Sequence, residues 1–308
     1  MKSISAFCPA GISSFFQAVT TSPIPQSFGE ICHIGARGGG FIIDKGVTTK
    51  ITVSPASKSQ IAVRINNQNA PGAKVTREVC SLLLEKVDAK YHISVDHAVE
   101  VPIGAGYGAS AAGAVSTAMA LSKALSIHLT LNQIGQLAHI AEIRSATGLG
   151  SVSGVIRGGA ILILEPGAPG YDRVDWVPLE PSHRIVTASF APISKKDIIF
   201  SKKALRVVNR EAQRVLDQFL EDPNPVYFMD LCRDFAKKAG FLSKRLATVL
   251  DIVVEAGALG ATQNMIGDAF HALVDVNDIT SVVNSLTEIF PSNNIQVMLP
   301  SRGGPRYV

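Results

Sequence analysis

Apolar residues alternate with polar or small ones over residues 93–101, which is the period of a half-buried strand. The residues that share one face are Ile93, Val95, His97, Val99 and Val101. The strand is expected to end at Pro102. Residues 110–127 are rich in Ala, Leu and Met, which favour helix. The chain thus has a strand, a loop with three closely spaced glycines, and a helix in succession.

Similar patterns predict further strands and helices along the chain. A first strand is expected at 3–7, broken by the Cys-Pro-Ala-Gly sequence 8–11, and a hairpin is expected over 41–53 with its turn at Lys45 and Gly46. Helices are expected at 74–86, 130–145, 201–221, 226–240, 243–256 and 280–289, and strands at 184–190 and 294–299. The segment 257–273 is expected to run from a glycine-rich turn into a helix. These elements predict an α/β (α+β) fold with domains over 1–180 and 181–308, divided soon after the turn-rich stretch 166–175.

Composition excludes several classes of protein. The chain has 308 residues, of which 46% are hydrophobic, so it is long and apolar enough to bury a core and is not disordered. Its net charge of +4 is spread along the sequence, and we expect no nucleic acid as a partner. The four cysteines form no CxxC pair, which argues against a zinc site or a disulfide framework. No signal peptide or membrane span is recognisable, so we expect a cytoplasmic protein without a membrane partner.

The glycine-rich loop is the best candidate for chemistry. Gly104, Gly106 and Gly108 leave the backbone amides open to an anion, and the following helix directs its free N–H groups and the positive end of its dipole at them. This arrangement suits a polyphosphate. The loop lacks the Gly-Lys-Ser/Thr ending of a P-loop, and no acidic residue between Glu100 and Glu142 completes a dinucleotide fingerprint. Ser110 can cap the helix or place its hydroxyl on a metal ion.

Glu142 lies in an apolar helical stretch, where a carboxylate needs a partner. A metal ion, Arg144 and His139 are the candidates, and a structural ion pair is an equal alternative. A second glycine-rich segment, 147–159, follows this helix, and the two turns are expected to wall one pocket. Arg37 stands beside the glycines of residues 35–40, where it could bind a ligand's carboxylate or lie on the surface of a hairpin.

Taken together, these motifs resemble those of the GHMP kinases. The sequence PIGAGYGASAAG at 102–113 resembles their phosphate loop, and four further segments occur in the order found in the archaeal pantoate kinases. These are AFCPAGISSFF at 6–16, GARGGGFIIDKGV at 35–47, AHIAEIRSATGLGSV at 138–152 and GALGATQNMIGDAF at 257–270. The resemblance implies a two-domain fold, with a ribosomal-protein-S5-like N-terminal domain, a ferredoxin-like α+β C-terminal domain, and the active site between them.

The resemblance also implies a reaction and its cofactors, ATP and Mg²⁺. The γ-phosphoryl group of ATP would pass to the primary hydroxyl of pantoate, giving 4-phosphopantoate for coenzyme A biosynthesis. Ser110 and Glu142 would hold the metal and act with position 151 in catalysis. The loop residues assigned to ATP are Pro102, Gly104, Ala105, Gly106, Tyr107, Gly108, Ala109 and Ser110.

Two positions depart from the family pattern. Ser151 stands where the family has an Asp that serves as a base or supports the metal site, and Gly11-Ile12-Ser13 replaces His-Ile-Thr. A kinase can act without the base, because transfer passes through a loose transition state. The alternatives are therefore a slower enzyme, a kinase for another small hydroxy acid or alcohol of the mevalonate or shikimate type, and an inactive nucleotide-binding relic.

Pantoate carries a carboxylate, so an arginine is expected near the acceptor. The candidate substrate-binding residues are Ser13, Arg37, Arg144 and Arg157, with surface or packing roles as the alternative for the arginines. Ser194 is a weaker candidate for a phosphate contact. By resemblance we also expect a homodimer.

Overall fold

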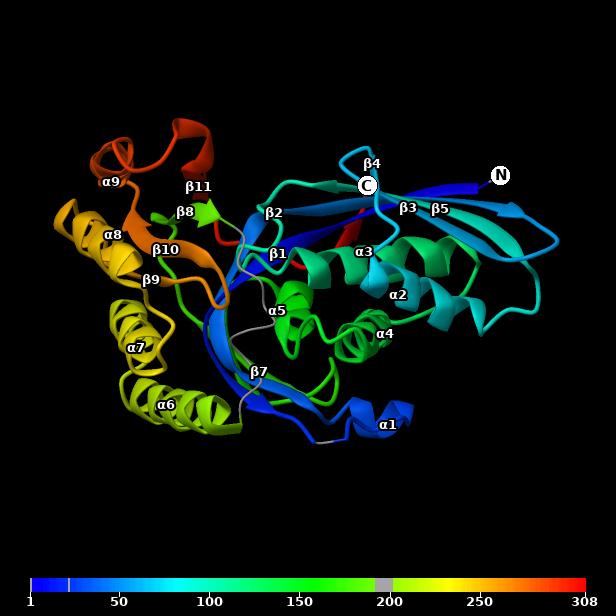
Figure 1. Ribbon diagram of the computed structural model, residues 1–308, viewed down its shortest axis with the longest axis horizontal. Helices are drawn as coiled ribbons and strands as arrows, with labels where there is room; N and C mark the ends of the chain where they lie inside the picture. The colour runs from blue at the N-terminus through cyan, green and yellow to red at the C-terminus, as the bar shows by residue number, and fades with distance from the viewer. Residues whose placement is uncertain (1, 22, 192–201) are drawn as a thin grey trace.

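The computed structural model describes residues 2–21, 23–191 and 202–308, whose strands form two sheets (Figure 1). In the described residues the larger sheet has the order β12-β1-β2-β5-β3-β4, with β6 paired to β2 and β7 paired to β6. Its strands are β1 (Lys2–Val19), β2 (Gly35–Pro55), β3 (Gln60–Ile65), β4 (Gln68–Asn69), β5 (Tyr91–Val99), β6 (Ala160–Glu165), β7 (Arg173–Val177) and β12 (Arg306–Tyr307). The parallel pair β3 and β5 flanks a helix in sequence, which makes a βαβ unit.

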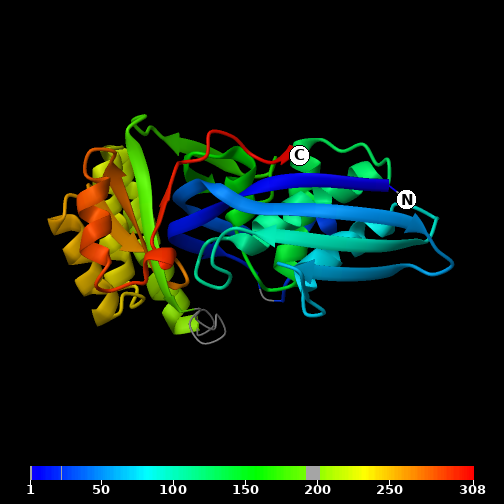
Figure 2. The same cartoon turned by 90° about the horizontal axis from the view of Figure 1, so that it is seen from above.

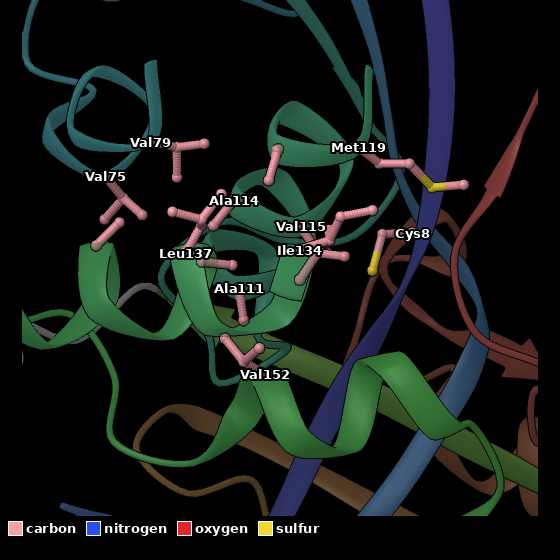
Figure 3. Packing of buried hydrophobic residues seen from close by; sticks show 14 of the residues in the cluster. Cys8, Val75, Val79, Ala111, Ala114, Val115, Met119, Ile134, Leu137 and Val152 are labelled. Atoms are coloured by element: carbon pink, nitrogen blue, oxygen red, sulfur yellow. The ribbon is translucent and has the colours of Figure 1, made fainter. Parts of the chain in front are cut away.

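Helices cover one face of this sheet, and the main core lies between them (Figure 1). They are α1 (Phe28–Ile31), α2 (Lys74–Leu84), α3 (Ala109–Ala124), α4 (Leu131–Arg144) and α5 (Ser151–Arg157). Helix α3 is rich in alanine and buried on nearly every side, so its neighbours can approach closely. Figure 3 shows the resulting contacts, in which Val79, Leu137 and Val152 surround Ala111 and Ala114 of α3.

The smaller sheet and the remaining helices form the other end of the molecule (Figure 2). The sheet is antiparallel with the order β11-β8-β10-β9. Its strands are β8 (His183–Ala191), β9 (Gly260–Gln263), β10 (Asp268–Asp275) and β11 (Gln296–Met298). The helices are α6 (Lys202–Glu221), α7 (Pro225–Lys238), α8 (Lys244–Glu255) and α9 (Ile279–Leu286), and a 3-10 turn, η2, covers Ser292–Asn294. The boundary expected near residue 180 falls between β7 and β8.

The glycine and proline signals near the N-terminus were misleading about the first two strands. Strand β1 does not stop at residues 8–11 but continues through a bulge between Pro9 and Ala10. The hairpin expected over 41–53 is wrong, because β2 runs without a break from Gly35 to Pro55. Gly46, expected in the turn, lies within β2 and pairs with Pro9 beside the bulge. The glycines allow close packing of strands instead of a turn, since a Cβ atom on Gly40 would lie 2.0 Å from the carbonyl oxygen of Ile12.

Two further expectations need correction. The segment 257–273 contains no helix but the hairpin β9–β10, and β10 is buried on both faces, so its sequence shows no alternation of apolar and polar residues. The stretch 151–157, expected as a turn, forms the short helix α5. The long helices expected at 74–86, 110–127, 130–145, 201–221, 226–240, 243–256 and 280–289 are confirmed in their described residues to within a few residues at each end.

Candidate active site

The glycine-rich loop connects β5 to α3 in the conformation that an anion site requires. Gly104, Gly106 and Gly108 have φ angles of 82°, 85° and 61°, in the region that other residues adopt only with strain. Gly108 is the N-cap of α3, and because it has no side chain, none covers the first N–H groups of the helix. These amides and the helix dipole can therefore bind phosphate oxygens.

The first strand supports this loop from one side. The N–H of Gly11 donates to the carbonyl of Tyr107 over 3.2 Å, and a Cβ atom on Gly108 would lie 2.7 Å from the carbonyl oxygen of Gly11. Gly11 is one of the departures from the family pattern. Among the assigned loop residues, Ala105 and Tyr107 have buried side chains, so they can contact a nucleotide only through their backbones.

Ser110 and Glu142 meet beside the loop. Ser110, in the first turn of α3, donates a hydrogen bond to Oε1 of Glu142 on α4, and the hydroxyl of Thr147 donates to the same oxygen over 2.8 Å. Glu142 is only 3% exposed. A Cβ atom on Gly148 would lie 2.1 Å from Oε2 of Glu142, so the second carboxylate oxygen needs a glycine next to it.

This pair fits magnesium in its chemistry. Mg²⁺ prefers oxygen ligands and is usually bound by one or two carboxylates together with water and substrate phosphates. No group of three or more His, Cys, Asp or Glu side chains placed to hold a metal occurs in the described parts of the chain. His139 is not the partner of Glu142, because its Nε2 bonds to the carbonyl of Ile34 over 3.0 Å and burial lowers its pKa.

A cavity of about 540 Å³ opens beside Thr147 and Gly148, which contact Glu142, although Ser110 and Glu142 do not line it themselves. It is lined by residues from β1, β2, the segment 143–154 and β6, and by Leu205, Met265 and Ile266 of the second half of the chain. Ile12, Phe15, Ile42 and Ile161 give it largely apolar walls. Among the described residues that line it, Arg37 and Lys74 are cationic and none is an Asp, Glu or His.

Two of the candidate substrate residues, Ser13 and Arg37, line this cavity, as does Ser151 at the first position of α5. Arg37 donates from Nε to the carbonyl of Leu164 over 2.8 Å, and from Nη1 to the side-chain oxygens of Gln17 and Gln213 over 2.9 and 2.7 Å. All three acceptors are neutral, so these contacts orient the guanidinium without cancelling its charge.

The other two candidate arginines lie elsewhere. Arg144 forms an ion pair of 2.9 Å with Glu78 at the surface. Arg157 makes a two-pronged pair with Asp172, with distances of 2.7 and 3.0 Å, and lines a different hollow beside Trp176. Ser194 lies outside the described residues.

Sequence reasoning did not single out two residues of this site, Thr147 and Lys74. Thr147 is five residues after Glu142, and its place at the start of a glycine-rich turn was the available signal. Lys74 was assigned to a helix, but nothing in the local sequence indicates that the start of this helix borders the cavity.

Comparisons with known proteins agree with this geometry. Residues 74–161, which include the glycine-rich loop and Glu142, match the GHMP kinases N terminal domain. A solved structure of a phosphotransferase related to the CoA biosynthesis pathway superposes over 100% of this chain and 99% of its own, with a TM-score of 0.87 and 26% identity. The chain has the GHMP kinase fold. The mixed α/β class expected from the sequence is thereby confirmed.

The relatives also bear on the type of enzyme. The pantoate kinase of Thermococcus kodakarensis is 29% identical over 88% of this chain and 87% of its own length. The resemblance of this chain to the pantoate kinases is confirmed, and it indicates a small-molecule kinase. A solved complex of MDDEF with MVAPP, AMPPCP and magnesium has the same fold, with a TM-score of 0.71 and 16% identity over 99% of this chain and 98% of the other. No helix in the described residues has both the length and the apolar character needed to cross a membrane.

Proposed function

We propose that this protein transfers the γ-phosphoryl group of ATP to the primary hydroxyl of pantoate, giving 4-phosphopantoate and ADP. The observation that carries the proposal is the position of Arg37. Its guanidinium, bound only to neutral acceptors in the contacts described above, lines an apolar cavity beside Thr147 and Gly148, which contact Glu142. A small substrate with a carboxylate for Arg37, apolar groups for the cavity walls and a hydroxyl to receive the phosphoryl group fits this site. The similarity to pantoate kinases over most of the chain supports the assignment.

Each part of the site has a role in this reaction. The amides at the start of α3 and the glycine-rich loop would bind the ATP phosphates. Ser110 and Glu142 would hold Mg²⁺, which offsets charge on the phosphate oxygens when it is bound. Arg37 would bind the pantoate carboxylate through paired hydrogen bonds, and Ile12, Phe15 and Ile42 would contact its two methyl groups. The substrate hydroxyl is thereby oriented toward the γ-phosphate.

The acceptor proton has no protein base among the described residues that line the cavity. The acceptor oxygen forms a bond to the γ-phosphorus while the bond from that phosphorus to the oxygen of the β-phosphate breaks. In a loose transition state the acceptor keeps its proton until late, and a phosphoryl oxygen or water can take it. Ser151 would then act by hydrogen bonding and not as a base.

The test is ADP release by the purified protein with ATP, Mg²⁺ and D-pantoate, run beside mevalonate, shikimate and homoserine. Of the four acceptors, we expect only pantoate to be phosphorylated, and we expect the product to be 4-phosphopantoate. Turnover with another acceptor would keep the kinase and reject pantoate, whereas nucleotide binding without turnover would reject both. A homodimer and a cytoplasmic location complete the proposal, and light scattering of the purified protein checks the first of them.

A further inference from the structure

The turn of the β9–β10 hairpin packs directly against the back of the phosphate-binding loop. A Cβ atom on Gly106 would lie 2.9 Å from Cβ of Asn264, and one on Gly267 would lie 2.3 Å from the carbonyl oxygen of Ala105. The N–H of Met265 also donates to the carbonyl of Ser13 over 2.9 Å. This turn belongs to the glycine-rich segment 257–270, to which the mechanism above assigns no role.

A chain of buried hydrogen bonds fixes this turn. Ser14 Oγ lies 2.8 Å from Nε2 of His271, and Nδ1 of His271 lies 2.8 Å from Oδ1 of Asn264. All three residues are 0% exposed. Because an amide oxygen only accepts, Nδ1 of His271 carries the proton, and Nε2 accepts from the Ser14 hydroxyl. Burial lowers the pKa of His271 to about 3, so the ring is neutral and each of these bonds is satisfied.

The chain of bonds ends on the phosphate-binding loop. Asn264 Nδ2 lies 3.5 Å from the carbonyl oxygen of Ala105. The hydroxyl of Tyr107 lies 2.7 Å from Oγ1 of Thr187, which in turn donates to the carbonyl of Phe270 on β10. Two residues of the loop therefore contact the smaller sheet, Ala105 through Asn264 in the β9–β10 turn and Tyr107 through Thr187 on β8.

The order Ser14, His271, Asn264 has the polarity of a nucleophilic triad, but burial excludes that chemistry. A nucleophile must reach its substrate, but all three side chains are buried and none of them lines the cavity. The phenyl ring of Phe41 packs edge-on against the imidazole, with ring centroids 5.6 Å apart, and helps to cover it. The remaining consequence of the network is mechanical.

We propose that Asn264 and His271 are positioning residues that hold the Ala105–Tyr107 part of the loop in the conformation that binds the nucleotide. The inference rests on the proposed function. A loop with three glycines has many accessible backbone conformations, and fixing it in advance removes that entropic cost from ATP binding. The loop connects two elements of the first half of the chain, and Asn264 and His271 hold it from the smaller sheet in addition to Gly11 of β1.

The test compares Asn264→Ala, His271→Gln and Ser14→Ala with the unchanged protein. We expect Asn264→Ala to raise the KM for ATP and the Kd for Mg²⁺–AMPPCP about tenfold, because the substitution leaves buried polar groups without their partner and releases the loop. The effect should decrease in the order Asn264, His271, Ser14, following distance from the loop. The KM for pantoate should change less than about twofold, whereas a general loss of structure would change both KM values.

Thr76→Val is the matched control. It removes a buried hydrogen bond of 3.0 Å to Nε2 of His97, between α2 and the larger sheet, so it should lower the Tm without changing the KM for ATP. The proposal is overturned if folded Asn264→Ala binds Mg²⁺–AMPPCP as tightly as the unchanged protein. It is also overturned if Thr76→Val raises the KM for ATP as much as Asn264→Ala does. If Asn264→Ala does not fold, Asn264→Ser and His271→Gln replace it, and the change in their KM for ATP is compared with the change in their KM for pantoate in the same way.

Measuring the Kd for Mg²⁺–AMPPCP by calorimetry separates this proposal from the proposed function. Wild-type protein that binds Mg²⁺–AMPPCP but does not phosphorylate pantoate rejects the substrate and still reports on the loop. Wild-type protein that does not bind Mg²⁺–AMPPCP rejects both.

Discussion

Ser110 of α3 and Glu142 of α4 are hydrogen-bonded although they lie 32 residues apart in the sequence. The contact places the carboxylate of Glu142 beside the start of α3. Thr147 holds the same carboxylate oxygen, so Glu142 is fixed in orientation. A buried carboxylate in this setting is well placed to meet a cation that arrives with the phosphates.

Glu142→Gln should abolish most activity while leaving the fold intact. The amide keeps an oxygen that accepts from Ser110 and Thr147 but loses the charge that attracts Mg²⁺. We expect kcat to fall about 10³-fold and the Mg²⁺ concentration for half-maximal rate to rise, measured by ADP release over a magnesium titration. Glu78→Gln, which alters an exposed carboxylate paired with Arg144, is the control and should leave both quantities unchanged.

Ser151→Asp should restore the carboxylate that the family pattern places here. Position 151 begins α5 and lines the cavity, and an acidic residue at a helix N-terminus is favourable, so we expect no loss of stability. A general base contributes about 10²–10⁴-fold where it is required, and we expect kcat to rise by up to about 10². Ser151→Asn has nearly the same shape without the charge, and an equal gain in that variant would contradict this interpretation.

Arg37→Met should weaken pantoate binding without affecting ATP. A charge-assisted contact to a carboxylate is worth about 1.5–3 kcal/mol, which corresponds to a rise in the KM for pantoate of about 10- to 100-fold. Initial rates at varied pantoate and saturating ATP measure it. Arg144→Met is the matched control, because Arg144 pairs with Glu78 outside the cavity. A similar rise in Arg144→Met would show that the effect comes from general charge.

Arg157→Met should destabilise the protein. It removes the partner of Asp172, whose side chain is 0% exposed, and leaving a buried charge without its partner costs about 3–5 kcal/mol. Denaturant unfolding measures the loss, and Arg157→Met combined with Asp172→Asn should recover part of it. If Arg157 bound pantoate, the folded variant would show a raised KM for pantoate, which we do not expect.

Acid should destabilise the protein through His97. Burial lowers the pKa of His97 from 6.5 to about 4, so the unfolded chain binds a proton between these values and the folded protein does not. Its contribution to stability is complete above pH 6.5 and is lost as the pH falls toward 4. The loss is about 3 kcal/mol at pH 4. Unfolding free energies from pH 7 to 4 test this. His97→Gln should remove the part of the dependence that His97 contributes, whereas His271, with a pKa lowered to about 3 by burial, should keep its own part.

The sequence predicted the loop and its helix because their signals are local. Three glycines, an alanine-rich helix and a capping box at Thr130 and Gln133 depend only on nearby residues. The hairpin β9–β10 was missed because a strand covered on both faces has no alternation. The two strands predicted over 41–53 are parts of the single strand β2, and this continuity was missed because the glycines of β2 serve contacts with β1. Which arginine borders the cavity could not be predicted either, since Arg37 and Arg157 both stand beside glycines and differ only in what the fold brings to them.

Strand β12 pairs with Ala6 and Phe7 of β1, so the edge of the larger sheet is completed by residues that follow every other element of the chain. During synthesis on the ribosome, the smaller sheet and its helices are made before β12, so β1 lacks this partner until synthesis is almost complete. Until then its outer edge offers unpaired backbone groups to other strands, including those of neighbouring nascent chains. Chaperones that bind exposed strands would therefore find this part of β1 accessible until β12 pairs with Ala6 and Phe7.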